Sequence, residues 1–288
     1  MSPQDSAVSP PSSAASGSNF FDEYPRFYET SQTAAIRDRL NLRYEAIFAE
    51  NRDVFDGARV LDLASHDGRW SLAALKNGAT HVVGIEGRPE LVAHAKENFE
   101  HYRIERGRYR FVAGDIFKEI ETPYAAFDLV LCLGFLYHTL RYNELMYQVR
   151  RMEPRHVIID TGVIDDEEPV VRLRTEPVAE QRNAIADAYS WRGGVLSGEP
   201  SVAAVAKLLS AYDFEVERMT DWAQLLGANP DAKGVLDYAT GRRITVRART
   251  VERSPTTTAR SASRAMRRIA RDWSPPVLTR WVRSRRRG

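Results

Sequence analysis

Short apolar segments alternate along the chain with amphipathic segments of helical length, and this alternation restricts the fold more than any other feature. Five apolar segments that predict strands are separated by segments that predict helices. The strand segments are residues 58–65, 81–87, 109–117, 127–138 and 155–163. Because strand–helix–strand units are right-handed and place helices on both faces of a sheet, the pattern predicts a doubly wound, mostly parallel α/β fold.

The remaining segments complete one domain with extensions at both ends. Residues 201–214 predict a helix, and residues 215–219 and 242–249 predict two more strands, which gives a seven-stranded Rossmann-like sheet. We therefore divide the chain into four parts. They are a disordered leader (1–19), N-terminal helices that cover the site (20–55), the main domain (56–250) with a substrate-side insertion (164–200), and a basic linker and tail (251–288).

The composition argues against several classes of protein. The chain has 288 residues, of which 43% are hydrophobic, and this is enough for an ordinary core. The single cysteine, Cys132, lies in an apolar segment, so neither a disulfide framework nor a cysteine metal site is predicted. Apolar runs fall short of the ~20 residues that span a bilayer, and residues 1–19 lack the features of a signal peptide. We expect a cytoplasmic protein.

The net charge of +2 conceals two regions of opposite sign. Residues 251–288 contain eleven arginines and two acidic residues, a charge of +9, which leaves −7 on residues 1–250. The acidic body argues against a nucleic-acid-binding face across the domain. The tail fits three roles: a solubilising arm, a peripheral anchor at the anionic inner membrane surface, or an RNA-binding arm.

Polar residues follow the predicted strands at the ends where doubly wound sheets bind ligands. Asp62, Glu86 and Asp115 end the first three strands, and residues 134–138 end the fourth. Glu86, 24 positions after Asp62, is placed to accept hydrogen bonds from both hydroxyls of a ribose. This arrangement predicts a ligand that contains a nucleoside.

Two details favour a cationic, phosphate-free nucleoside over a dinucleotide. The loop after the first strand lacks the G-x-G-x-x-G spacing, and Asp67 places a negative charge where a pyrophosphate would lie. In residues 113–117, "AGDIF", an aspartate beside an apolar residue suits the amino group and the face of an adenine.

At these positions the sequence resembles the class I S-adenosylmethionine-dependent methyltransferases, over roughly residues 55–250. The family's glycine-rich motif corresponds to residues 60–68, "VLDLASHDG", where Ala64 and His66 replace two glycines and Gly68 is retained. We expect Ala64 to be tolerated if its φ stays negative. We expect His66 to shape the loop rather than act as a base, which requires a position where its side chain can point away from the cofactor. The resemblance implies S-adenosyl-L-methionine as the cofactor. The predicted cofactor contacts are Asp62, Ala64, Ser65, Gly68, Glu86, Asp115, Ile116, Leu133 and Tyr137.

Residues 127–249 resemble more closely the bacterial tRNA wobble-uridine 5-carboxymethoxy transferase group. In that group the tyrosine of "LYH" and an arginine of the last strand help to bind the extra carboxylate of the cofactor or the substrate, which implies roles for Tyr137 and Arg243. The group's N-terminal lysine has no counterpart, because residues 1–55 contain no lysine. We therefore expect methyl rather than carboxymethyl transfer. Alternatively, Arg243 lies on the solvated face of an edge strand.

Methyl transfer to a hydroxyl needs a group that takes the acceptor's proton, and a neutral histidine is suited to this role. His138, at the end of the fourth strand segment, is the candidate base; the alternative is a histidine that caps the following helix or fills the end of the strand. The acidic run at residues 165–168 fits a solvated turn better than a Mg²⁺ site, so no metal is predicted.

The insertion supplies aromatic and cationic side chains that suit a sugar or an anionic acceptor. The predicted substrate contacts are Arg182, Tyr189, Trp191 and Arg243. The sequence thus predicts an S-adenosylmethionine-dependent enzyme that O-methylates a small-molecule, glycan or glycolipid hydroxyl. Two alternatives stay open: a tRNA uridine-modifying transferase, and a non-catalytic cofactor-binding scaffold suggested by the altered glycine motif.

Overall fold

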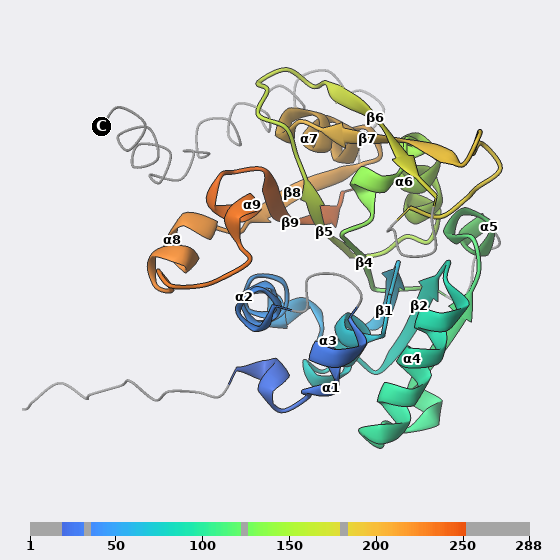
Figure 1. The fold of residues 1–288 in the computed structure, drawn as a ribbon, viewed down its shortest axis with the longest axis vertical. Coiled ribbons are helices and arrows are strands. Elements are labelled where there is room, and N and C mark those ends of the chain that lie inside the picture. Colours follow the sequence, from blue (N-terminus) through green and yellow to red (C-terminus); the bar gives the residue numbers. More distant parts are fainter. Residues whose placement is uncertain (1–18, 32–35, 122–125, 179–183, 252–288) are drawn as a thin grey trace, which may run out of the picture.

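The computed structural model describes residues 19–31, 36–121, 126–178 and 184–251, and its centre is a seven-stranded sheet (Figure 1). The strands lie in the order β3-β2-β1-β4-β5-β9-β8. They are β1 Arg59–Leu63, β2 His81–Glu86, β3 Tyr109–Ala113, β4 Leu129–Leu133, β5 His156–Gly162, β8 Phe214–Met219 and β9 Arg243–Thr250. Nearly all of the predicted leader and tail lies outside the described residues, and the roles predicted for the tail stay predictions.

Strands β1 to β5 pair in parallel, and β9 runs antiparallel between β5 and β8. Strand β4 is buried along its whole length, because helices cover both faces of the sheet. The prediction of a doubly wound, mostly parallel, seven-stranded sheet is therefore confirmed. Strand β9 is an interior strand, so the edge-strand interpretation of residues 242–249 is wrong.

The order of the strands places a ligand crevice beside β1. From β1 the chain continues outward to β2 and β3, and it then returns to add β4 on the other side of β1. The connections that leave β1 and β4 therefore diverge at their carboxyl ends. Doubly wound sheets bind ligands at this reversal of strand order.

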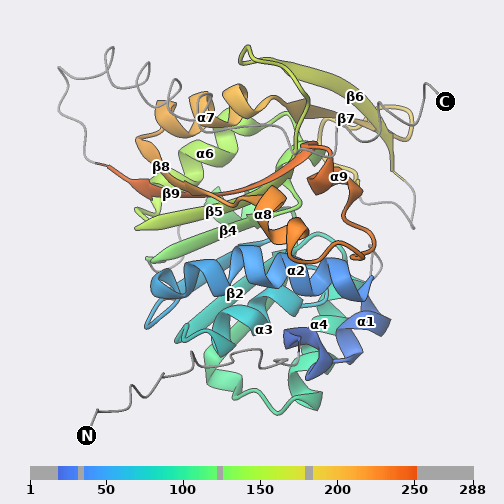
Figure 2. The same ribbon diagram turned by 90° about the vertical axis from the view of Figure 1, so that its left-hand side faces the viewer.

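Helices form one layer on each face of the sheet, and each layer covers its own core (Figure 2). One core joins the sheet to α2, α3 and α4, and it contains Trp70 and Phe99. The other joins it to α5, α6 and α7, and it contains Leu145 and Val205. The helices are α1 Arg26–Thr30, α2 Arg37–Ile47, α3 Arg69–Lys76, α4 Pro89–His101, α5 Ile116–Glu121, α6 Tyr142–Arg151, α7 Val202–Ala211, α8 Trp222–Gly227 and α9 Leu236–Ala239, with 3₁₀ turns η1 Phe20–Asp22, η2 Ala49–Val54, η3 Arg106–Arg108 and η4 Leu136–His138.

The insertion forms a separate two-stranded sheet. Strands β6 Val171–Pro177 and β7 Gly194–Pro200 pair antiparallel, and β7 packs on η4 at the end of β4. The hairpin therefore lies beside the crevice and can supply side chains to it. Among the residues that the structure describes, no helix is both long and apolar enough to span a membrane.

Candidate active site

A cavity of about 620 Å³ lies at the carboxyl ends of the central strands. Helix α2, the loops after β1, β2, β3 and β4, and the insertion all contribute to its wall. Its lining includes Ala64, Glu86, Asp115, Ile116, Leu133, Tyr137, His138 and Arg243 of the residues predicted from the sequence, together with Arg39, Arg43, His66, Arg69, Arg88, Ile185 and Asp187. A volume of this size is typical of sites for small ligands and cofactors.

The loop after β1 keeps a glycine-like backbone without its glycines. Ala64 has φ 57° and His66 has φ 53°, and Gly68 follows with φ 82°. The expectation that Ala64 would need a negative φ is therefore wrong. A side chain in this left-handed region costs about 1–2 kcal/mol, and the loop tolerates it because its neighbours hold the backbone in place.

Three of the predicted cofactor residues, one in β1 and two in this loop, are not part of the cavity wall. Asp62 is fully buried and accepts a hydrogen bond from Ser71 Oγ at 2.6 Å. Ser65 is also buried, and its N–H donates to the carbonyl of Ile85 at 3.0 Å. A Cβ at Gly68 would lie 3.0–3.2 Å from side chains of β3 and α4. These positions shape the loop, and their direct contact with a cofactor stays a prediction.

Glu86 connects the loop after β1 to the loop after β2. Its Oε2 accepts the His66 N–H at 2.9 Å, and its Oε1 accepts the Arg88 N–H at 3.1 Å. Burial raises the pKa of this carboxyl, and the backbone N–H groups of His66, Arg88 and Gly87 oppose that effect. A carboxylate has about four acceptor sites, so Glu86 retains capacity for a hydroxyl donor from a ligand in the cavity.

Asp115 and Ile116 lie at the start of α5 and line the cavity. Asp115 Oδ1 accepts the Phe117 N–H at 3.0 Å, and Asp115 Oδ2 lies 4.0 Å from Arg141 Nη1. Oδ2 is therefore the better placed acceptor for a ligand amine. Ile116 and Leu133 add apolar surface to the same cavity. The structure thus brings together the residues predicted for an adenine.

His66 is among the residues that line the cavity, and the direction of its side chain relative to a cofactor stays a prediction. Its Nδ1 lies 3.4 Å from Asp67 Oδ1. Burial and the nearby Arg69 lower the pKa of His66, which keeps the ring neutral at pH 7. Asp67 is fully buried beside Arg69, and it accepts a hydrogen bond from Thr30 Oγ1 at 2.9 Å. Burial would raise the pKa of Asp67, but Arg69 and its hydrogen-bond donors lower it to about 2.

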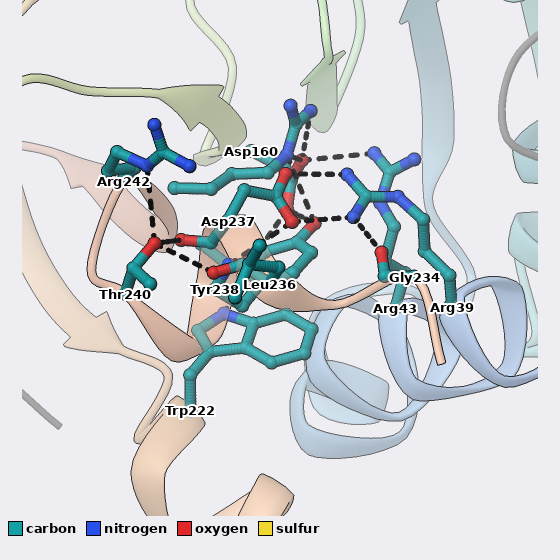
Figure 3. Close-up of polar contacts among 12 residues, drawn as sticks. Arg39, Arg43, Asp160, Trp222, Gly234, Leu236, Asp237, Tyr238, Thr240 and Arg242 are labelled. Atoms are coloured by element: carbon teal, nitrogen blue, oxygen red, sulfur yellow. Dashed lines mark hydrogen bonds and ion pairs between the residues drawn. The ribbon is translucent and has the colours of Figure 1, made fainter. Parts of the chain in front are cut away.

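A buried ion cluster forms the cavity wall between α2 and β9 (Figure 3). Asp160, fully buried in β5, accepts hydrogen bonds from Arg243 Nε at 2.8 Å and from Arg43 Nη2 at 3.0 Å. Its other oxygen accepts from Tyr238 and Thr245 at 2.8 and 2.7 Å. Burial would raise the pKa of Asp160, but the two guanidinium groups hold it well below its usual range.

Two further contacts extend this cluster. Arg39, one turn before Arg43 on α2, forms a bidentate pair with Asp237 at 2.6 and 2.7 Å. Arg243 Nη1 donates to the Tyr137 hydroxyl at 3.3 Å. Among the described residues, five arginines and three carboxylates line the cavity, so its lining carries a net positive charge.

His138 lies in η4 and lines the same cavity. Its Nδ1 is 2.9 Å from Glu176 Oε2, and Ser197 Oγ donates to Glu176 Oε1 at 2.6 Å. Glu176 and Ser197 belong to the β6–β7 hairpin. Helix α6 begins after Arg141 without a side-chain cap, so the alternative in which His138 caps this helix is wrong.

Of the substrate residues predicted in the insertion, the two that the structure describes are exposed and do not line the cavity. Tyr189 and Trp191 are exposed by 72% and 76%, and the Arg141 guanidinium lies 5.4 Å from the Tyr189 ring centre. Arg182 lies outside the described residues. Ile185 and Asp187, in the same insertion, line the cavity. The acidic run at 165–168 is exposed to solvent.

Sequence reasoning missed Arg39, Arg43 and Glu176. The two arginines had a usable signal, because residues four apart share one face of a helix that was expected to cover the site. No signal in the sequence pointed to Glu176, since a charged residue in an alternating strand is typical of a solvated face.

Residues 60–153 match the family model described as a methyltransferase domain. This segment contains β1 to β4, the left-handed loop and the cavity residues Glu86, Asp115 and His138. The fold is that of the S-adenosylmethionine-dependent methyltransferases. The segment covers about a third of the chain, and the β6–β7 hairpin lies beyond it.

Two solved structures share this fold. An S-adenosylmethionine-dependent methyltransferase from Mesorhizobium loti is 19% identical, with a TM-score of 0.50 over 72% of this chain and 97% of that chain. The N-terminal domain of EvdMO1, solved in the presence of SAH and D-fucose, is 19% identical, with a TM-score of 0.50 over 71% of this chain and 81% of that chain.

Among curated relatives, the ribosomal RNA large subunit methyltransferase K/L of Chromohalobacter salexigens is 32% identical over 99 residues, which are 33% of this chain and 14% of the relative. The chain spans only 10–37% of the length of the first three relatives. The prediction of a methyltransferase domain is confirmed for residues 60–153, and the solved structures support the predicted fold. The relation to the tRNA wobble-uridine group stays a prediction.

Proposed function

We propose that the protein transfers a methyl group from S-adenosylmethionine to a hydroxyl group of a small molecule or a glycan. The observation that carries this proposal is the position of His138. Its imidazole lines the same cavity as Glu86 and Asp115, and its Nδ1 is bound to a carboxylate. A histidine held in this way is a suitable base for an alcohol acceptor.

The residues of the cavity fit the cofactor. Glu86 is held by backbone donors and retains acceptor capacity, and it would hold the ribose of the cofactor. Asp115 and Ile116 would hold the adenine, and the positive side of the cavity near Arg43 and Arg243 suits a carboxylate. When bound, S-adenosylmethionine supplies an electrophilic methyl group on a positively charged sulfur.

The protein's own groups then have two tasks. The cavity walls hold the acceptor close to the methyl group, which reduces the entropy cost of the reaction. His138 takes the hydroxyl proton as the new oxygen–carbon bond forms. The exposed rings of Tyr189 and Trp191, in the insertion that also supplies Ile185 and Asp187 to the cavity wall, support a sugar acceptor, because aromatic faces pack against sugar rings.

RNA is the second candidate acceptor. The ribosomal RNA methyltransferases among the relatives and the +9 charge of residues 251–288 favour it. The charge of −7 on residues 1–250 opposes it, because phosphate contacts dominate the affinity of proteins for nucleic acids. The scaffold alternative is weakened by the loop after β1, since Ala64 and His66 adopt the left-handed backbone that the two glycines would otherwise supply.

Calorimetry with S-adenosylmethionine and S-adenosylhomocysteine tests the cofactor site. Glu86→Gln removes the charge from a buried acceptor, and hydrogen bonds to charged groups contribute about 1.5–3 kcal/mol, so we expect affinity to fall about 10- to 100-fold. Glu90→Gln, on the exposed surface of α4, is the matched control and should bind normally. A wild-type chain that binds neither compound would refute the proposed cofactor site, whereas binding without turnover on any acceptor would favour the scaffold.

A screen with labelled cofactor over glycans, phenolic compounds and tRNA then identifies the acceptor. Methylation of a sugar or phenol by the chain truncated after residue 251, at the rate of the full chain, is the expected result. Label found only in tRNA, and lost on truncation, would replace the proposal with the RNA alternative.

A further inference from the structure

We propose that Glu176, in the β6–β7 hairpin, is a positioning residue that holds His138 in the tautomer required of a base. The structural part of this inference stands on contacts alone. Its catalytic consequence rests on the function proposed above. Neither the family match, which ends at residue 153, nor the sequence pattern assigns a role to Glu176.

The contacts determine which ring nitrogen carries the proton. Glu176 uses one oxygen for His138 Nδ1 at 2.9 Å and the other for the Ser197 hydroxyl at 2.6 Å. Burial would raise the pKa of Glu176, but these two hydrogen bonds lower it below its ordinary value. An ionised carboxylate only accepts hydrogen bonds, so Nδ1 must be the donor. In the neutral ring the lone pair therefore lies on Nε2.

Tight packing of the hairpin on the main domain brings the two residues together. Gly198 of β7 lies against the segment that follows η4, and a Cβ there would be 2.5 Å from Leu140 Cδ2 and 2.8 Å from the Tyr142 hydroxyl. A side chain at this position would therefore require the Leu140 and Tyr142 side chains to shift. Glu176 thereby reaches a histidine that is 38 residues away in the sequence.

Glu176 has two effects on the reaction. It keeps the Nε2 lone pair free for the acceptor hydroxyl, and it opposes the positive charge that the ring gains. The acceptor O–H bond breaks, and its proton binds Nε2. At the same time the acceptor oxygen bonds to the methyl carbon, and the methyl–sulfur bond breaks with its electron pair left on sulfur. The positive charge lost at sulfur thus reappears on the imidazolium, beside the Glu176 carboxylate.

Nitrogen-15 NMR of histidine-labelled protein, recorded without cofactor, tests the structural part. We expect His138 in the wild type to carry its neutral-state proton on Nδ1. Glu176→Gln can place an amide NH₂ against Nδ1, which favours the opposite tautomer, so we expect the Nδ1-protonated signal to disappear. Glu199→Gln changes a carboxylate of the same hairpin that pairs with Arg172 and Arg174, and it should leave the His138 signal unchanged.

Turnover tests the catalytic part. With the acceptor found by the screen, Glu176→Gln should lower kcat about 10²-fold or more, as expected for loss of a working base, while KM and S-adenosylhomocysteine affinity change little. Glu176→Asp, which keeps the carboxylate, should recover part of the rate. Thermal melting of each variant confirms that the domain is folded.

The two parts fail separately. An Nε2-protonated ring in the wild type, or a tautomer that Glu176→Gln does not change, would overturn the inference whatever the chain catalyses. The expected tautomer shift without turnover on any acceptor would support the contact and refute the proposed function. An unchanged kcat in folded Glu176→Gln would remove Glu176 from the reaction.

Discussion

Replacing Asp160 by asparagine should destabilise the protein strongly, because this carboxylate is the shared partner of two buried arginines. Asp160 has no exposed surface, and Arg43 and Arg243 are exposed by 9% and 7%. The substitution preserves side-chain shape, so it creates no cavity; it removes the charge and places an NH₂ donor where an oxygen accepts hydrogen bonds from neighbouring donors. Breaking a buried ion pair by removing one partner costs about 3–5 kcal/mol. For a domain of about 200 residues, each kcal/mol lowers Tm by about 2–4 °C, so we expect a fall of about 6–20 °C.

Urea and thermal denaturation at pH 7 measure this effect. Asp165→Asn, at an exposed position, is the matched control and should change stability by no more than about 0.5 kcal/mol. The pH dependence adds a second check. Because the pKa of Asp160 is lower in the folded chain than in the unfolded chain, its stabilisation is complete above about pH 4 and decreases as the pH falls further. The difference between wild type and Asp160→Asn should therefore be constant from pH 7 to pH 5 and shrink below pH 4. A loss under 1 kcal/mol at pH 7 would refute the reasoning, since it would mean that the two arginines do not need this charge.

Two further predictions concern the loop after β1. Ala64→Gly should raise the free energy of unfolding by about 0.5–1 kcal/mol, because glycine adopts φ 57° without strain and this outweighs its greater freedom in the unfolded chain. Urea denaturation measures the free energy of unfolding. The control, Ala74→Gly inside α3, should instead lower it by at least about 1 kcal/mol. Asp62→Asn should stabilise the protein at pH 8, because burial raises the pKa of Asp62 to about 7 and the folded chain must ionise a buried group that the unfolded chain ionises freely. That gain should be near zero at pH 4 and reach as much as about 4 kcal/mol above pH 7; a gain that does not vary with pH would rule out ionisation of Asp62 as its cause.

The sequence alone determined the features that depend on neighbouring residues. The alternation of apolar and amphipathic segments predicted all seven strands of the main sheet, since periodicity reports which face of a local element is buried. The polar residues at strand ends predicted Glu86 and Asp115 in the cavity, because parallel strands of a doubly wound sheet bring these ends to one edge.

Only the tertiary structure decided the contacts between distant segments and the backbone of the altered loop. Arg43 and Asp160 are 117 residues apart in the sequence. Their contact depends on how α2 packs against β5 and β9, and the sequence around each residue does not determine that packing. The positive φ of Ala64 could not be predicted from the local sequence, because a glycine is the usual sign of a left-handed backbone. Alanine adopts this conformation when tertiary contacts, such as the His66–Glu86 hydrogen bond, hold the loop in place. The local sequence identified His138 as a candidate base, but it could not identify Glu176 as its partner. That contact depends on how the β6–β7 hairpin packs on the main domain, where Gly198 lies against the segment that follows η4.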